Sequence, residues 1–99
     1  MLRDIELAFI RLHILHHAQQ EEVFGVGLMA ELARHGYAIG AGTLYPLLAK
    51  LEKAGLLTCR PRAVGHKQRK YYRITPRGRR VLRAMKAKTR ELYQELVEE

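Results

Sequence analysis

Residues 41–55 read AGTLYPLLAKLEKAG, and this stretch decides the fold. Its leucines recur at helical spacing and form one apolar face: Leu44, Leu47, Leu48 and Leu51. We therefore expect a helix from Ala41 to Ala54 that ends at Gly55. At about 100° per residue, the face away from the leucines carries Thr43, Pro46, Ala49, Lys50 and Lys53, with Tyr45 on its flank. The pattern predicts a helix that buries its leucines and presents a slim, polar surface.

A second helix is expected immediately upstream, from Phe24 to about His35, because its apolar residues repeat at the same spacing: Leu28, Met29, Leu32 and Ala33. Gly36 is a suitable stop for this helix. A short turn through Gly40 then leads into the helix at 41–54. Two helices joined by such a turn are typical of a helix-turn-helix.

The first helix, expected from Ile5 to about Ala18, has two apolar stripes. One comprises Ile5, Ala8, Phe9, Leu12 and Leu15, and the other Leu7, Ile10 and Ile14. A surface helix of a monomer needs only one apolar stripe. We therefore expect the stripe of Leu7, Ile10 and Ile14 to face a partner subunit. Residues 19–22, QQEE, are interpreted as a polar linker.

A β-hairpin is expected after Gly55, with strands at Leu56 to Arg62 and Arg69 to Ile74. Residues that alternate along these strands form its inward face: Leu57, Cys59, Tyr72 and Ile74. The predicted tip, residues 63–68, is basic and contains glycine. Cys59 is the single cysteine of the chain, and we expect it to be a small core residue.

The last helix is expected to begin at Thr75 and Pro76, a capping hydroxyl followed by a ring at the first helical position. Along it a narrow seam recurs at steps of three and four: Leu82, Met85, Thr89, Leu92 and Leu96. The seam suits either intramolecular packing or a coiled-coil-like contact with a second subunit. We favour the subunit contact, because four other elements already supply a core for this small domain.

These elements predict one domain, 1–99, that is mainly α with a small β-hairpin: a winged helix-turn-helix plus a long C-terminal dimerisation helix. Within it, 1–18 is a dimer-supporting helix, 24–55 the helix-turn-helix, 56–74 the wing and 75–97 the C-terminal dimerisation helix. No apolar run long enough to cross a bilayer is present, and the N-terminus does not have the order of a secretory signal. We expect a soluble, cytoplasmic protein.

The positive charge is concentrated in one part of the chain. The formal net charge is +8, and from Lys53 to Arg90 there are fourteen Lys and Arg residues and no Asp or Glu. One-signed stretches of this kind commonly meet a polyanion, nucleic acid first. Since a helix fits the major groove and a wing follows the phosphates, we expect double-stranded DNA to be contacted by Thr43, Tyr45, Lys50, Arg60, Arg62, His66, Lys67, Arg69, Lys70 and Arg73.

Three segments resemble the PadR family of transcriptional regulators: residues 42–48, GTLYPLL; residues 51–57, LEKAGLL; and residues 69–78, RKYYRITPRG. Gly25 and Leu28 extend the similarity upstream. The resemblance implies a winged helix that dimerises through its first and last helices and usually represses transcription, and it adds Gly42 and Pro46 to the expected DNA contacts. A dimer of this kind is expected to read the two half-sites of an inverted-repeat operator. It also implies release by a small, often aromatic, effector, which in short members lies between the subunits. The sequence departs from the family at residues 24–27, FGVG, and at Gly40.

Two other functional classes are weaker interpretations. A protein-interaction module would use the basic wing to bind an acidic partner. An enzyme lacks support, because the sequence has no serine, no paired carboxylates and no glycine-rich phosphate loop. His13, His16 and His17 have helical spacing that suits a metal ion, but we interpret them as surface histidines and expect neither a metal nor a cofactor.

Overall fold

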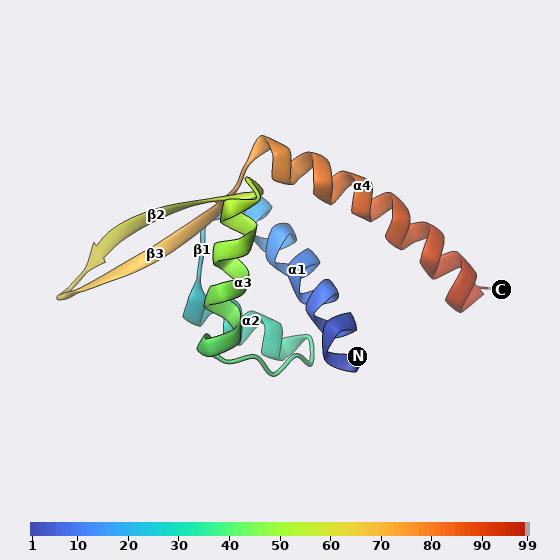
Figure 1. Ribbon diagram of the computed structural model, residues 1–99, viewed down its shortest axis with the longest axis horizontal. Coiled ribbons are helices and arrows are strands. Elements are labelled where there is room, and N and C mark those ends of the chain that lie inside the picture. Colours follow the sequence, from blue (N-terminus) through green and yellow to red (C-terminus); the bar gives the residue numbers. More distant parts are fainter. Residues whose placement is uncertain (99) are drawn as a thin grey trace.

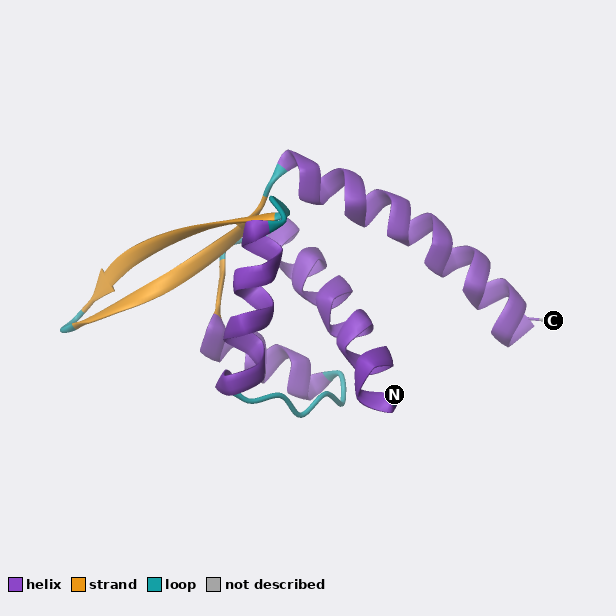
Figure 2. Cartoon of the chain, in the orientation of Figure 1, coloured by secondary structure: helices purple, strands orange, loops and turns teal. Residues whose placement is uncertain are grey.

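The computed structural model describes residues 1–98 as three helices, a hairpin and a long final helix (Figure 1). The elements are, in order, α1 (Leu2–Gln20), β1 (Val23–Phe24), α2 (Gly25–Arg34), α3 (Ala41–Lys53), β2 (Leu57–Val64), β3 (Lys67–Ile74), α4 (Pro76–Tyr93) and a π-helical turn, η1 (Gln94–Glu98). Figure 2 shows the mainly helical composition, with the hairpin projecting from one end of the body. The predicted fold class, a winged helix-turn-helix, is confirmed.

The sheet has three antiparallel strands in the order β1-β3-β2, one more than predicted. In β1, Val23 pairs with Tyr72 and Phe24 with Tyr71. The hairpin strands are also longer than predicted, because Gly65 has a φ of 63° and closes the turn with His66. A two-residue turn with glycine at its first central position leaves both strands paired nearly to the tip.

The core lies where all elements meet. It contains Ile10, Ile14, Leu15 and Ala18 of α1, Leu28 and Leu32 of α2, Leu44, Leu47, Leu48 and Leu51 of α3, Leu57, Tyr72 and Ile74 of the sheet, and Leu82 of α4. The predicted leucine face of α3 is thus buried. Cys59 packs against this core and is partly buried. Burial, aided by the neighbouring Cys59 thiol, raises the pKa of Tyr72 to about 12.

The predicted interface stripe of α1 needs correction. Ile10 and Ile14 are 0% exposed within a single chain, so they fill its own core and are not available to a partner. In the other stripe Ile5 and Phe9 are 52% and 44% exposed, whereas Leu15 is buried in the same core. Leu82, predicted in the seam of the last helix, is likewise in the core. On α1 the error arises because both stripes are apolar and both contribute to the core, Leu15 from one and Ile10 and Ile14 from the other. Leu82 is buried because it lies in the first turns of α4, which pack on the core.

The start of α4 is fixed by its cap. The hydroxyl of Thr75 accepts a hydrogen bond from the Gly78 amide at 3.0 Å and donates one to the Gly55 carbonyl at 2.6 Å. The predicted capping is therefore present, and it ties the helix start to the turn after α3. Gly78 is buried, and a side chain there would overlap the Leu56 carbonyl and come within 2.7 Å of Ile74.

Beyond its first turns, α4 projects away from the body, opposite to the hairpin (Figure 1). The molecule accordingly extends over 54 × 28 × 21 Å, with a radius of gyration of 14.3 Å. A compact domain of this length would have about 13 Å. Within residues 1–98, no helix combines the length and apolar character needed to cross a membrane. The predicted polar linker is partly wrong, because Gln19 and Gln20 extend α1.

Candidate nucleic-acid interface

The exposed face of α3 carries the residues that the sequence places there. Gly42, Thr43, Pro46 and Lys50 are exposed, together with Ala49 and Lys53, whereas the leucines are buried. Pro46 lies inside the helix, which continues past it. Thr43 offers a hydroxyl and Lys50 an ammonium group, so this face has both a short polar group and a long cation for base edges or phosphates.

Tyr45 is held on the flank of this face by α2. Its ring lies against Gly25, the first residue of α2, so closely that a Cβ on Gly25 would come within 2.9 Å of Tyr45 Cε1. The ring is 39% exposed. Absence of a side chain at Gly25 therefore allows Tyr45 to lie between the two helices of the helix-turn-helix while its edge remains accessible.

The cations of the hairpin share one face. Arg62 pairs with Arg69 across the strands, and Arg60 pairs with Tyr71. Since side chains alternate along a strand, this face carries Arg60, Arg62, Lys67, Arg69 and Arg73, and the other face begins with the core residues. Lys70 pairs with Pro61 and lies on the opposite face, the one that carries the core residues nearer the body; Lys70 itself is exposed. His66 lies in the turn.

Two of these arginines are already engaged. Arg62 Nη2 donates to Glu22 Oε1 at 2.7 Å, and its guanidinium lies 4.0 Å from the centre of the Tyr71 ring. Arg69 lies 4.3 Å above the Phe24 ring, which in turn is 5.6 Å from Tyr71. These exposed contacts are each worth roughly 1 kcal/mol or less. They orient both guanidinium groups without locking them.

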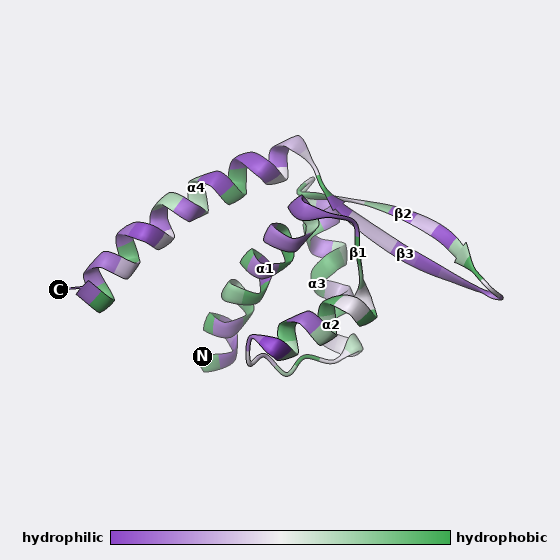
Figure 3. Ribbon diagram, turned by 180° about the vertical axis from the view of Figure 1, so that it is seen from behind, coloured by the Kyte–Doolittle hydropathy of each residue, from purple (hydrophilic) through white to green (hydrophobic). Residues whose placement is uncertain are grey.

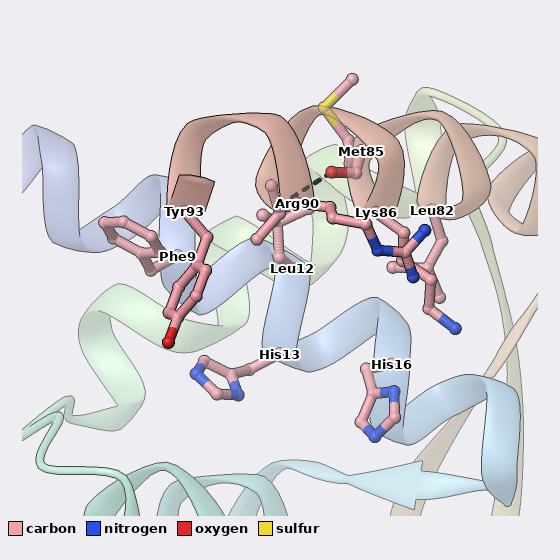
Figure 4. Close-up of a pocket in the computed structure, with 10 residues that line it drawn as sticks. Phe9, Leu12, His13, His16, Leu82, Met85, Lys86, Arg90 and Tyr93 are labelled. Carbon is pink, nitrogen blue, oxygen red and sulfur yellow. Dashed lines mark hydrogen bonds between the residues drawn. The ribbon is translucent and has the colours of Figure 1, made fainter. Parts of the chain in front are cut away.

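A groove of about 530 Å³ separates α1 from α4. Figure 4 shows Phe9, Leu12, His13 and His16 along one wall and Leu82, Met85, Lys86, Arg90 and Tyr93 along the other. Thr89 also lines it and donates within its own helix to the Met85 carbonyl at 2.7 Å. Of the predicted seam, Leu82, Met85 and Thr89 line this groove, whereas Leu92 and Leu96 are 42% and 70% exposed.

Histidines gather on the side of α1 that faces the end of α2. The centre of the His13 ring lies 4.4 Å from that of His35 and 5.5 Å from that of Tyr37. The pKa of His13 is lowered mainly by burial and secondly by the neighbouring His35. Burial also lowers the pKa of His17, against the opposing effect of Glu31. Both shifts favour the neutral imidazole, and the 3.6 Å contact between His17 and Glu31 is an ion pair only when His17 is protonated.

Comparison with known proteins identifies the family. Residues 14–84 match the transcriptional regulator PadR-like family. The chain is also 46% identical to the transcriptional regulator Rv3488 of Mycobacterium tuberculosis, over 97% of this chain and 90% of that protein. The chain belongs to the PadR-like family of transcriptional regulators. The resemblance noted in the sequence is thereby confirmed, as is the expectation that the protein is not an enzyme.

Solved PadR structures share the fold. A PadR family regulator from Eggerthella lenta superposes with a TM-score of 0.81 at 37% identity, covering 98% of this chain and 89% of that one. A PadR-like regulator from Bacillus cereus gives a TM-score of 0.84 at 29% identity, covering 94% and 92%. Membership in this family makes the chain a transcriptional regulator and implies DNA binding.

Several residues of this PadR surface escaped the sequence analysis. Glu22 and Phe24 were assigned to a linker and a helix start, yet they contact the two arginines described above. Strand β1 has only two residues, too few for alternation to reveal it. His35 was unnoticed because its partners lie on another helix. Phe9 and Tyr93 were apolar or aromatic positions without an assigned role.

We predict that Gly25→Ala displaces the Tyr45 ring and lowers the free energy of unfolding by about 1 kcal/mol, at the low end for overpacking because the ring can swing into solvent. In a Tyr45→Ala background the same change is expected to be neutral, since the overlapping ring is gone. Urea denaturation of the four proteins measures the cycle. An equal cost in both backgrounds would contradict the described packing of Tyr45.

Proposed function

We propose that this PadR protein is a homodimeric, sequence-specific DNA-binding repressor whose operator is an inverted repeat. The observation that carries the proposal is the pairing of a slim polar face on α3 with a row of cations on one face of the adjoining hairpin. A helix of this kind suits the major groove, and a cationic wing suits the flanking phosphates. Two such units in a dimer suit half-sites roughly 34–36 Å apart.

The two surfaces differ in the contacts that they offer. On α3, Gly42 and Pro46 give a low surface for close approach, while Thr43, Tyr45 and Lys50 supply donors and acceptors for base edges. The wing supplies guanidinium and ammonium groups, which bind phosphate oxygens whatever the base sequence. We therefore assign sequence discrimination to α3 and most of the salt-dependent affinity to the wing.

Substitutions on the two surfaces are expected to have different effects. Arg60→Ala or Lys67→Ala weakens binding to operator and random DNA alike and reduces the salt slope by about 0.9 per lost phosphate contact. Arg62→Ala costs less than Arg60→Ala, because Arg62 exchanges the Glu22 carboxylate for a phosphate. Thr43→Ala or Lys50→Ala instead alters the preferred sequence by about 1–3 kcal/mol per base pair.

Fluorescence anisotropy with operator and random duplexes at several salt concentrations measures both effects. The assigned division of roles is wrong if variants of α3 and of the wing change affinity and slope in the same way. Equal, weak binding of the unaltered protein to both duplexes would favour an acidic protein partner instead.

Dimerisation is supported by the unfilled surface along α1 and α4. The chain exposes 7101 Å², whereas a compact monomer of this mass exposes about 5,800 Å². Large apolar side chains account for part of the excess: Leu2, Ile5 and Phe9 on α1, and Leu92, Tyr93, Leu96 and Val97 toward the C-terminus. Figure 3 shows apolar and polar residues mixed along the projecting α4. In the proposed dimer, helix α4 of the partner subunit packs against these residues and covers them. Leu7 then lies at the edge of the contact, and Met85 and Thr89 lie within the groove.

We predict that Leu92→Glu converts the dimer to a monomer, because it places a charge in the proposed apolar contact. Ala87→Glu is the matched control: it adds the same charge to the same helix at an exposed position on the side away from the seam. Analytical ultracentrifugation reports the mass of each protein. A monomeric unaltered protein, or a Leu92→Glu protein that stays dimeric, would contradict the proposed interface.

The groove between α1 and α4 suits a small effector. Phe9 and Tyr93 offer aromatic faces, and Lys86 and Arg90 place positive charge beside them. We propose that a flat aromatic molecule, preferably an anionic one, binds here between the subunits and releases the protein from DNA. Repression then follows from occupation of the operator in its absence.

The decisive experiment for regulation is a footprint on the region upstream of the protein's own gene. We expect protection of an inverted repeat that is lost when an aromatic carboxylic acid of the effector class is added. Phe9→Ala is expected to preserve the footprint but to reduce the response to that compound. Protection that no aromatic compound relieves would refute the effector, and absence of any protected repeat would refute autoregulation by this protein.

A further inference from the structure

Three histidines from two helices converge beside the helix-turn-helix. His13 and His17 lie one turn apart on α1, and His35 is the residue that follows the last turn of α2. One ring nitrogen of each lies within 4.8 Å of those of the other two. We propose that these three imidazoles form a binding site for a transition-metal ion of the zinc class.

The spacing of the nitrogen atoms is close to that of a filled site. Zn–N bonds of 2.0–2.1 Å in a tetrahedral site place neighbouring nitrogens about 3.4 Å apart. The three atoms therefore need to approach one another by at most about 1.4 Å, a displacement that side-chain rotation supplies. His35 is exposed at the C-terminal cap of α2, so its ring is free to make this adjustment and the site is open to solvent.

A second observation points to a missing ligand. The Nε2 atom of His17 is buried and has no hydrogen-bond partner within the described part of the chain. Leaving a buried polar atom unpaired is unfavourable, and natural structures usually satisfy it. Coordination of an ion by this nitrogen would satisfy it, because the neutral imidazole offers a lone pair there.

Glu31 lies beside His17 but is not one of the three groups that converge. Its Oε1 lies 3.6 Å from His17 Nε2, and its other oxygen is held by Arg34 at 2.6 Å. Three imidazoles with a carboxylate or water in the fourth position form a ligand set that zinc accepts, and imidazole also suits cobalt, nickel and copper.

His16 provides an internal control, because it lies on the same helix as His13 and His17 but outside the cluster. Its ring meets His17 edge-on at 5.2 Å, and it lines the groove toward α4 (Figure 4). Spacing along α1 thus suggested a trio of His13, His16 and His17, whereas packing replaces His16 by His35. The ion would join α1 to the end of α2, just before the loop that leads to α3.

The test uses the full chain without an affinity tag, stripped of metal and titrated with Zn²⁺ by calorimetry and with Co²⁺ by visible absorption. We expect one ion per chain and the intense d–d bands of tetrahedral cobalt. His35→Gln and His17→Gln are each expected to weaken metal binding at least about tenfold. Loss of a residue that only supports a ligand already lowers metal affinity by about that factor, and loss of a ligand itself should cost no less. His16→Gln and His66→Gln are expected to bind as the unaltered protein does.

Circular dichroism and thermal melting without metal establish that each variant is folded; His35 is exposed, so its replacement leaves the core intact. A rise in melting temperature with Zn²⁺ is expected for the unaltered protein and not for His35→Gln. The site is refuted if the unaltered protein binds no ion. It is equally refuted if His35→Gln binds as tightly, or if His16→Gln loses as much affinity as His35→Gln. None of these readouts involves DNA.

Discussion

The orientation of α3 depends on the burial of its four leucines in the core. Each buried leucine contributes up to about 1.5–3 kcal/mol relative to exposure, an upper bound because the unfolded chain already covers some surface. Rotating α3 by one residue would expose part of this face and drive lysine toward the core, at the cost of an unpaired charge. Burial of the leucines therefore determines which side chains face outward. The surface offered to DNA is a consequence of the core behind it.

The same physical rule explains how far the sequence could predict the structure. One-faced elements were predicted well: α3, the inward residues of the hairpin and the capped start of α4 each have a single apolar face or a local signal. On α1, however, both stripes are apolar and both contribute to the core, Leu15 from one and Ile10 and Ile14 from the other, and the local pattern does not show this division. Ile10 and Ile14 were assigned to the wrong side for this reason. Contacts such as Arg62 with Glu22, 40 residues apart, were beyond any local rule.

The wing illustrates how a short strand can matter more than its length suggests. With only two residues, β1 contributes little to the core, yet it places Glu22 and Phe24 beside the cations of β2 and β3. Mutual repulsion among clustered cations would otherwise spread these side chains. The carboxylate and the aromatic rings offset part of that repulsion while leaving the guanidinium groups at the surface. Because the contacts are weak, the proposed exchange of these partners for a phosphate would cost little, and the arginines would approach DNA partly ordered.

Helix α1 contributes residues to the core, to the groove against α4 and to the histidine cluster. Its buried residues support the helix-turn-helix, and its exposed stripe forms one wall of the groove. His13 belongs to both the groove and the histidine cluster. Occupants of the two sites would therefore share a side chain, and a ring turned toward an ion is withdrawn from the groove. Linkage requires that any such effect be reciprocal, so an effector that reorients His13 changes the affinity for the ion by the same factor. Since α1 also packs on α2, a bias applied to α1 at either site would act on the helix-turn-helix that we propose binds DNA.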